Sequence, residues 1–205
     1  LYKKFGIDFI KLIKGMFAIC IVDENYDKIY LIRDRFGIKP LYYYYNKKDN
    51  SLIFCSEIKG IVASGKYKKE INLNEAYLYL KKGFINATNE TWFKNILQVP
   101  SGSYITFNRN ELKNTKYYFI EKNVDEGLDN EKITFKSTLD NIKEKIFNSF
   151  DQHKNFDVIG GLHISGGTDS AVISALANIF KLNESLKTYT FTFENKKFSE
   201  LGDAK

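Results

Sequence analysis

The sequence predicts two architectures in one chain: an α+β first half with antiparallel strands, then an α/β second half with a parallel sheet. Short β-branched and aromatic runs separated by turn-like polar segments fill the first half. Helix and strand patterns alternate in the second half, which indicates parallel strands joined by helices. We place the boundary in the polar stretch 123–132, giving domains 1–125 and 126–205.

The first half is expected to contain hairpins and two short helices. The expected strands are 16–22, 28–32, 41–45, 51–55, 103–107 and 116–120, and the expected helices are 58–63 and 74–82. Met16–Val22 is apolar throughout, so we expect burial on both faces. Asp23–Asp27 and Asn46–Asn50 are typical turns. Asn72 or Asn74 is expected to cap the second helix and Gly83 to end it.

The second half shows helical spacing first. Apolar residues at 135, 139, 142, 146, 147 and 150 predict an amphipathic helix over 135–151. A strand at 158–164, a helix at 169–180 and a strand at 187–193 are expected to follow.

Composition excludes several classes of protein. Hydrophobic residues make up 43% and charged residues 27% of the 205 residues, which is ordinary for a globular protein. No apolar run approaches the roughly 20 residues of a membrane span. Two cysteines, Cys20 and Cys55, are too few for a disulfide framework and indicate a reducing cytoplasm. We expect both to be buried or half-buried apolar side chains.

The positive charge does not indicate a nucleic-acid partner. The net charge is +6, and residues 1–125 carry 21 Lys and Arg against 13 Asp and Glu. These cations are scattered singly or in pairs, without the arginine stripe and interleaved aromatics of a nucleic-acid surface. We interpret the excess as solvated surface charge.

The sharpest chemical signal is Ser165-Gly166-Gly167-Thr168-Asp169-Ser170, between an expected strand and an expected helix. Two glycines let the backbone turn tightly around an anion, and the helix that follows presents unpaired amides and its positive dipole end. Hydroxyl groups add donors, and Asp169 offers an oxygen ligand for Mg²⁺. The loop lacks the lysine of the Walker-type loop, so it predicts a different phosphate cradle. A capped strand-to-helix turn is the alternative.

This loop resembles that of the ATP pyrophosphatase superfamily, whose members split ATP into AMP and pyrophosphate. Three blocks of the first half resemble the class II glutaminase domain of glutamine-hydrolysing asparagine synthetases: Gly15–Ala18, Arg33–Tyr43 and Phe54–Glu57. Pro100–Tyr104 is similar to that family's turn and strand before the linker. Glucosamine-6-phosphate synthase shares the glutaminase half but lacks the Ser165–Ser170 loop.

The resemblance implies the fold and the reaction. The first half would be the C-terminal part of an N-terminal-nucleophile αββα glutaminase sandwich, and the second the start of an ATP pyrophosphatase-type domain. A terminal cysteine would release ammonia from glutamine. ATP would activate aspartate as an aspartyl-adenylate, which ammonia would convert to asparagine. The implied partners are glutamine, aspartate and ATP with Mg²⁺, with no nucleic acid and no membrane, in the cytoplasm. A homodimer of the full-length protein is one option.

The resemblance also implies the site residues. The expected ATP-binding residues are Ser165, Gly166, Gly167, Asp169 and Ser170, joined by His163 and Phe191 beside the nucleoside, and Asp169 is the expected metal ligand. His163 would act through its backbone or be a plain strand histidine, and Phe191 would touch the nucleoside or belong to the core.

No catalytic residue is expected within the chain. Because it begins at Leu1 without a methionine, we interpret it as a piece of a longer protein whose nucleophilic cysteine lies upstream, and we expect the piece alone to be inactive. Two alternatives stay open: a related amidotransferase acting on another acceptor, and a catalytically silent gene product.

Several residues keep two interpretations. Asp34, with Arg33 and Arg35, is expected to fix the next turn by pairing of opposite charges, and a catalytic role is the alternative. Ser56 and Glu57 are expected to cap a helix or to line the passage between active sites. The run Tyr42–Tyr45 is expected to be a packed strand rather than a base-stacking platform.

Overall fold

The computed structural model describes residues 1–83, 88–108, 111–121, 134–155, 158–182, 186–194, 199 and 202. The chain divides into two compact units, Leu1–Asp129 and Asn130–Lys205, and each is described by itself. The expected boundary between residues 125 and 126 lies outside the described residues and stays a prediction. No described helix combines the length and the apolar composition that crossing a membrane requires.

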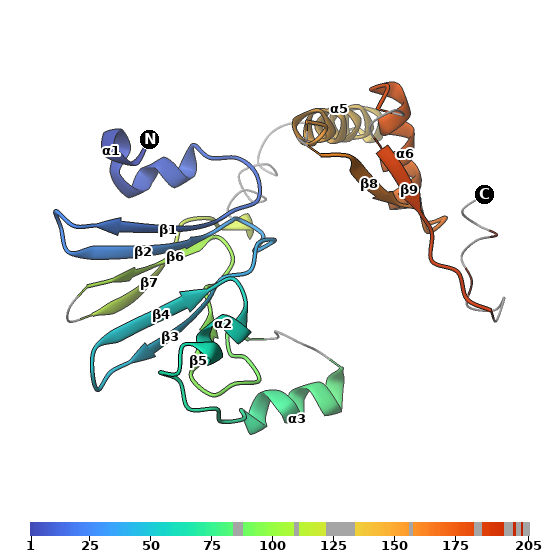
Figure 1. The fold of residues 1–205 in the computed structure, drawn as a ribbon. Helices are drawn as coiled ribbons and strands as arrows, with labels where there is room; N and C mark the ends of the chain where they lie inside the picture. Colours follow the sequence, from blue (N-terminus) through green and yellow to red (C-terminus); the bar gives the residue numbers. More distant parts are fainter. Residues whose placement is uncertain are drawn as a thin grey trace. The chain divides into compact units, whose positions relative to one another are not determined.

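Two antiparallel sheets form the centre of the first unit (Figure 1). The first sheet has the order β1-β2-β6-β7, with β1 Ala18–Asp23, β2 Lys28–Arg33, β6 Ser103–Phe107 and β7 Leu112–Lys116. The second has the order β4-β3-β5, with β3 Tyr42–Asn46, β4 Ser51–Cys55 and β5 Ile96–Gln98. The expected α+β class of this half is confirmed.

Helices cover the outer faces of both sheets. The short helix α1 (Tyr2–Phe5) and the 3-10 helix η1 (Gly6–Lys11) pack on the first sheet, and α2 (Ile58–Ala63) packs on the second (Figure 1). A further helix, α3 (Leu73–Lys82), begins at the cap Asn72, whose side chain accepts from an amide of the first turn, and ends at Gly83 in the left-handed conformation.

Three buried clusters correspond to this layering. One, around Phe9, Ile10 and Ile32, lies between η1 and the first sheet, and another, around Ile61 and Ile96, lies between α2 and the second sheet. The central cluster joins the two sheets and contains Leu31, Leu41, Tyr43, Val99 and Ile105. The first unit is therefore an α-β-β-α sandwich, in which truncating a central leucine to alanine would cost about 2–5 kcal/mol.

Two expectations for the strands are wrong. The strand expected at 116–120 lies at Leu112–Lys116, because its register with β6 pairs Ser103 with Lys116 and Phe107 with Leu112. The burial of Met16–Val22 on both faces is also wrong, since Cys20 is exposed and Val22 is 62% exposed. The reason is that β1 is the edge strand of its sheet, and only its other face packs against the η1 cluster.

The second unit contains two helices and a parallel strand pair. Its elements are α5 (Phe135–His153), β8 (Gly160–His163), α6 (Thr168–Ile179) and β9 (Leu186–Tyr189). The strands β8 and β9 are parallel, as expected, but shorter than the predicted ranges. A capping box of Thr134 and Ser137 begins α5. Phe147 and Phe150 of α5 contact the ring of Phe180 at the end of α6, with centroids 4.7 and 5.4 Å apart.

Candidate functional site

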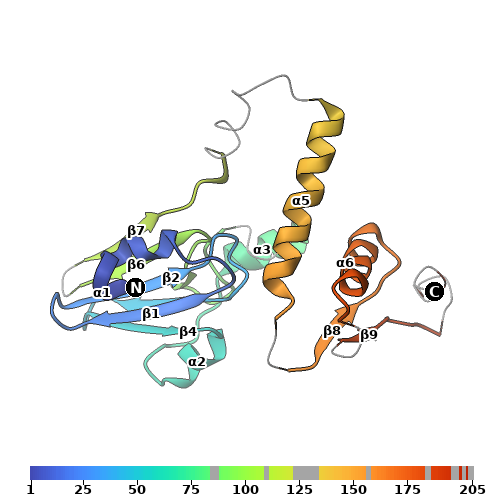
Figure 2. The same cartoon turned by 90° about the horizontal axis from the view of Figure 1, so that it is seen from above.

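The loop Ser165–Ser170 connects the parallel strand β8 to the helix α6 (Figure 2). Just before it, the amide of Ile164 donates to the carbonyl of Tyr189 at 2.8 Å, which ties the strand end to β9. Gly166 has φ of 78°, a conformation that other residues adopt at a cost. Gly167 follows in an extended conformation and is the N-cap of α6. The sequence-predicted strand–loop–helix arrangement is present.

Both serine hydroxyls of the loop form hydrogen bonds inside it. The Ser170 hydroxyl donates to the carbonyl of Gly167 at 2.9 Å and accepts from the amide of Ser165 at 3.3 Å. The Ser165 hydroxyl lies 3.3 Å from that of Ser170 and accepts from the amide of Gly167 at 3.4 Å. These contacts brace the turn, so both hydroxyls have a structural role besides any contact with a ligand.

The amino end of α6 offers anion-binding chemistry. Its N-cap is a glycine and forms no side-chain cap hydrogen bond within the described residues. Because the first amides of a helix have no intrahelical acceptor, those of Thr168 and Asp169 remain to be satisfied by water or a ligand. Gly166, Gly167, Thr168 and Asp169 are all exposed, so the turn is open to solvent. A phosphate group fits such a helix end.

His163 and Phe191 are brought together by the parallel strand pair. Their ring centroids lie 5.0 Å apart with the planes inclined by 48°. His163 ends β8, and Phe191 follows the end of β9. Phe191 is 67% exposed, so its interpretation as a core residue is wrong. Both rings therefore lie at the carboxyl-terminal end of the β8–β9 pair, the end from which the chain continues into the loop Ser165–Ser170.

Asp169 is the metal ligand that the sequence suggests. Its carboxylate is exposed in the first turn of α6. Within the described ranges no group of three or more His, Cys, Asp or Glu side chains is arranged to hold a metal ion. A single carboxylate suits Mg²⁺ that receives its other oxygen ligands from phosphate and water. The residues present therefore fit a magnesium–nucleotide complex rather than a protein-only metal site.

In the first unit, Asp34 organises the turn after β2. Its side chain is 1% exposed. The oxygen Oδ1 accepts from the amides of Phe36 and Ile38 at 3.1 and 3.0 Å, and Oδ2 accepts from the amide of Lys39 at 2.9 Å. Burial by itself raises the pKa of Asp34, but the amide hydrogen bonds, those of Lys39 and Ile38 foremost, outweigh it and hold the pKa below its usual value. This supports the structural role over the catalytic one.

Arg33 joins the same turn to Val99, the residue that follows β5. Its guanidinium donates to the carbonyls of Lys39 at 2.9 Å, Val99 at 2.8 Å and Gly37 at 2.6 Å. Gly37 has φ of 67°, and a Cβ there would lie 2.9 Å from Arg33 Cζ. Burial lowers the pKa of Arg33, and the nearby charge of Asp34 opposes that change. The contact with Val99 spans 66 residues, so no local sequence signal predicts it.

The expected pairing of charges in this turn is wrong in its mechanism. Among the described residues, Arg33, Asp34 and Arg35 form hydrogen bonds with backbone groups, and the ion pairs found lie elsewhere. Arg35 donates to the carbonyls of Ile13 at 2.6 Å and Lys11 at 3.1 Å. For Asp34 these partners are amides of the turn itself, whereas both arginines also reach carbonyls from other segments of the first unit.

Neither Cys20 nor Cys55 has the position expected of a nucleophilic cysteine at a chain terminus. Cys20 lies inside β1, and the surrounding protein raises the pKa of its thiol. Cys55 ends β4 and is half-buried as expected, whereas Cys20 is exposed, against expectation.

Glu57 occupies the N-cap position of α2 but forms no side-chain cap hydrogen bond, and instead pairs with Lys59 at 2.6 Å. Glu57 is therefore at the expected cap position, but its side chain does not cap the helix.

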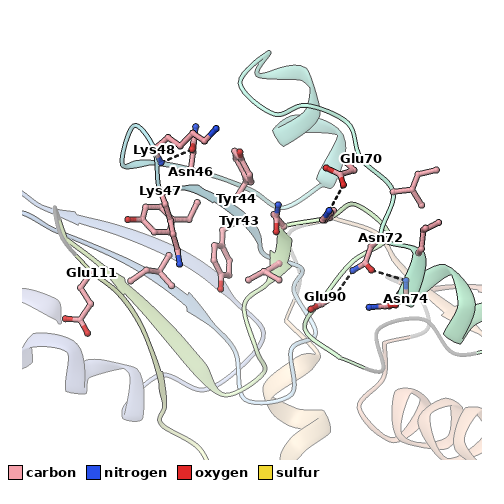
Figure 3. A pocket seen from close by; sticks show the side chains of 17 residues that line it. Tyr43, Tyr44, Asn46, Lys47, Lys48, Glu70, Asn72, Asn74, Glu90 and Glu111 are labelled. Atoms are coloured by element: carbon pink, nitrogen blue, oxygen red, sulfur yellow. Dashed lines mark hydrogen bonds and ion pairs between the residues drawn. The ribbon is translucent and has the colours of Figure 1, made fainter.

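A broad cleft of about 1370 Å³ opens elsewhere on the first unit, between β3, the start of α3 and β7 (Figure 3). Its polar side chains are partly engaged with one another. Asn72 donates to the carboxylate of Glu90 at 2.6 Å and accepts from the amide of Asn74 at 3.2 Å, while Glu70 pairs with Lys94. The sequence gives no signal for this cleft, because its lining comes from segments that are far apart in the chain.

Comparison with known proteins assigns both parts of the chain. A family model described as a glutamine amidotransferase domain matches residues 1–118, and one described as asparagine synthase matches residues 141–205. "Asparagine synthetase [glutamine-hydrolyzing] 2" of Bacillus subtilis is 34% identical over 97% of this chain and 28% of its own length. "Putative asparagine synthetase [glutamine-hydrolyzing] 2" of Methanocaldococcus jannaschii is 32% identical over 96% of this chain and 37% of its own length.

A third relative carries a different name. "Amidase chry2" of Gibberella zeae is 26% identical over 95% of this chain and 30% of its own length. The chain thus spans about a third of the length of these curated relatives. The two matched domains follow one another in the order that the sequence motifs predict. The chain therefore belongs to the glutamine amidotransferase family through residues 1–118, its residues 141–205 match the asparagine synthase family model, and over nearly its whole length it is similar to glutamine-hydrolysing asparagine synthetases.

Proposed function

We propose that this chain works as part of an ATP-dependent asparagine synthetase in the cytoplasm. In the proposed reaction, glutamine is hydrolysed to glutamate and ammonia. The side-chain carboxylate of aspartate attacks the α-phosphorus of ATP, which releases pyrophosphate and forms an aspartyl-adenylate. Ammonia then attacks the activated carbonyl, and AMP leaves as asparagine forms. Two free cysteines among the described residues agree with a reducing compartment.

The second unit would hold the ATP. We assign the pyrophosphate part of ATP to Ser165, Gly166, Gly167, Asp169 and Ser170, and the nucleoside side to His163 and Phe191. The helix amides and dipole favour the negative charge of the phosphates, and Asp169 would hold Mg²⁺ together with phosphate oxygens. Magnesium would neutralise charge that builds up on the departing pyrophosphate.

One observation carries the proposal: an exposed glycine turn leads directly from a parallel strand into a helix without a side-chain cap. In open parallel sheets, ligands bind at the carboxyl ends of the strands, where this turn lies. The turn also lies within the part of the chain that matches the asparagine synthase family. An anion-binding function explains why two glycines and an uncapped helix end occur together.

The first unit would belong to the glutamine-hydrolysing half. Asp34 and Arg33 support it by fixing the turn between the two sheets, and we assign them no contact with glutamine. The nucleophile would be a terminal cysteine other than Cys20 and Cys55, since neither of these can provide the free α-amino group that serves as base.

The substitution Asp169→Ala in the complete enzyme tests the assignment. We expect it to abolish ATP-dependent pyrophosphate release and to leave glutamine hydrolysis unchanged. Asp140→Ala, an exposed aspartate of α5, is the matched control and should leave both activities unchanged. Pyrophosphate release at the normal rate in the Asp169 variant would refute the site assignment.

A related amidotransferase that acts on another acceptor is the second candidate, and the relative named as an amidase favours it. The two candidates predict different products. Incubating the enzyme with ¹⁵N-amide glutamine, ATP and aspartate should give labelled asparagine by mass spectrometry if the first is correct. AMP formation that requires a different carboxylic acid, with no labelled asparagine, would establish the second.

A further inference from the structure

A small polar hollow of about 350 Å³ lies beside the turn that Arg33 and Asp34 organise. All of its lining residues belong to the first unit, whereas the loop Ser165–Ser170 belongs to the second. The lining residues are Arg33, Phe36, Gly37, Thr88, Asn89, Gln98 and Ser101. Its volume is near the lower end of the range for small-molecule sites, about 300–1000 Å³. It can therefore hold a small organic acid or a phosphate group.

Gln98 gives the strongest indication that this hollow binds a ligand. It is the last residue of β5 and only 9% exposed. Its backbone amide donates to the carbonyl of Asn89 at 2.8 Å, but its side-chain amide has no hydrogen-bond partner within the described part of the chain. Every fully buried side-chain N or O atom of the described residues does have a partner, so the Gln98 side-chain amide is not fully buried, and Gln98 is one of the residues that line the hollow.

Arg33 supplies a fixed positive charge to the same space. Its side chain is held by three backbone carbonyls and is 8% exposed. A guanidinium has five N–H groups, so two remain after these three contacts. Asp34 is adjacent in sequence, but its carboxylate oxygens accept the amides of the turn and do not line the hollow.

The other lining groups are also donors, or neutral. Asn89 and Ser101 carry an uncharged amide and an uncharged hydroxyl, and no Asp or Glu is among the lining residues. A buried cation with spare N–H groups, beside an unpartnered amide, is the arrangement that binds carboxylate or phosphate oxygens. We propose that this hollow is a binding site for a small oxyanion, a carboxylate or a phosphate, held by the Arg33 guanidinium and the Gln98 side-chain amide.

Binding of simple anions to the 1–205 chain tests the proposal. Sodium phosphate and sodium acetate are titrated separately by calorimetry at constant ionic strength, with sodium chloride as background, so that the two arms distinguish the phosphate and carboxylate classes. The substitution Gln98→Glu keeps the shape of the side chain and places a negative charge in the hollow. We expect it to weaken binding of the preferred anion by at least about tenfold, as loss of a charged hydrogen bond predicts.

Two further variants make the result decisive. Asn114→Asp makes the same change of charge at an exposed position of β7 and should leave the affinity unchanged. Gln98→Met removes the amide without adding charge, and it should weaken binding less than Gln98→Glu, with circular dichroism used to confirm folding. No heat of binding with either anion, or equal affinity in the wild type and in Gln98→Glu, would overturn the proposal.

Discussion

Replacing Asp34 by alanine is expected to destabilise the first unit strongly. The side chain is almost fully buried and accepts three backbone amides of one turn, from Phe36, Ile38 and Lys39. The backbone carbonyl of Asp34 also accepts from the amide of Gly102 at 2.8 Å, so the turn is tied to the start of β6. Alanine removes the shared acceptor and leaves the three amides to find water in a tightly packed place.

The magnitude follows from these contacts. An unsatisfied buried donor costs about 1–3 kcal/mol, and Asp34→Ala leaves three backbone donors without their acceptor. Since water can reach part of the vacated space, we expect a loss of about 3–5 kcal/mol in the free energy of unfolding. Against a domain stability of about 5–15 kcal/mol this is a large fraction. The melting temperature should fall by about 10–20 °C.

Tryptophan fluorescence during urea denaturation measures this loss. The chain has a single tryptophan, Trp92, which lies in the first unit beside the ring of Tyr79, so its signal reports that unit. Asp49→Ala is the matched control, because Asp49 also lies in a turn and accepts hydrogen bonds, from Ser51 at the start of β4, but is exposed. The control should unfold like the wild type. A change below about 1 kcal/mol in Asp34→Ala would refute the role given to the amide hydrogen bonds.

Three further predictions concern the same turn. Because the folded pKa of Asp34 is lowered, its contribution to stability should be complete above the unfolded pKa of about 3.9 and be lost as the pH falls below that value, measured by urea denaturation across pH. Gly37→Ala should lower the melting temperature of the first unit more than Gly65→Ala does. Both glycines have positive φ, but only at Gly37 would the new Cβ contact Arg33. Equal decreases in melting temperature would contradict this. Burial raises the pKa of Tyr117 to about 12, so stability should fall between pH 10 and 12 as the unfolded chain loses that proton first, and Tyr117→Phe should remove this part of the pH dependence.

The hairpins were predictable because their signals are local. Asp23–Asp27 and Asn46–Asn50 combine turn-forming residues with flanking β-branched and aromatic runs, and the structure confirms both turns between paired strands. The strand Ser51–Cys55 and the helix end at Gly83 are confirmed for the same reason. Each depends on residues close together in the chain.

The position of β7 was not predictable from its own composition. Lys116–Ile120 is more aromatic than Leu112–Lys116, so its composition predicts a strand there. The structure instead places the strand where a short connection allows antiparallel pairing with β6. The aromatic residues that follow pack on the Asp34 turn, with the Tyr117 hydroxyl donating to the carbonyl of Arg33 at 2.8 Å and the Tyr118 ring contacting Phe36.

The residues of the candidate sites also divide into those that a local motif predicts and those that only the folded structure brings together. The glycine turn before α6 is a local motif, so the sequence identifies it and its neighbours Asp169 and Ser170. The internal hydrogen bonds of Ser170 and the placement of Gln98 beside Arg33 depend on the folded backbone. The exposure of one face of β1 cannot be read from its apolar sequence, because a strand's place at the edge of a sheet depends on its partners rather than on its own residues.

The function proposed for the second unit requires that the turn before α6 binds the phosphate part of a nucleotide. Titrating the ¹⁵N-labelled 1–205 chain with magnesium pyrophosphate, while following the amide resonances of Gly166, Gly167 and Thr168, tests it most directly. We expect saturable downfield shifts of these three amides, and weaker binding in the Asp169→Ala variant. Saturation of other amides with these three unmoved, or no binding at all, would contradict it.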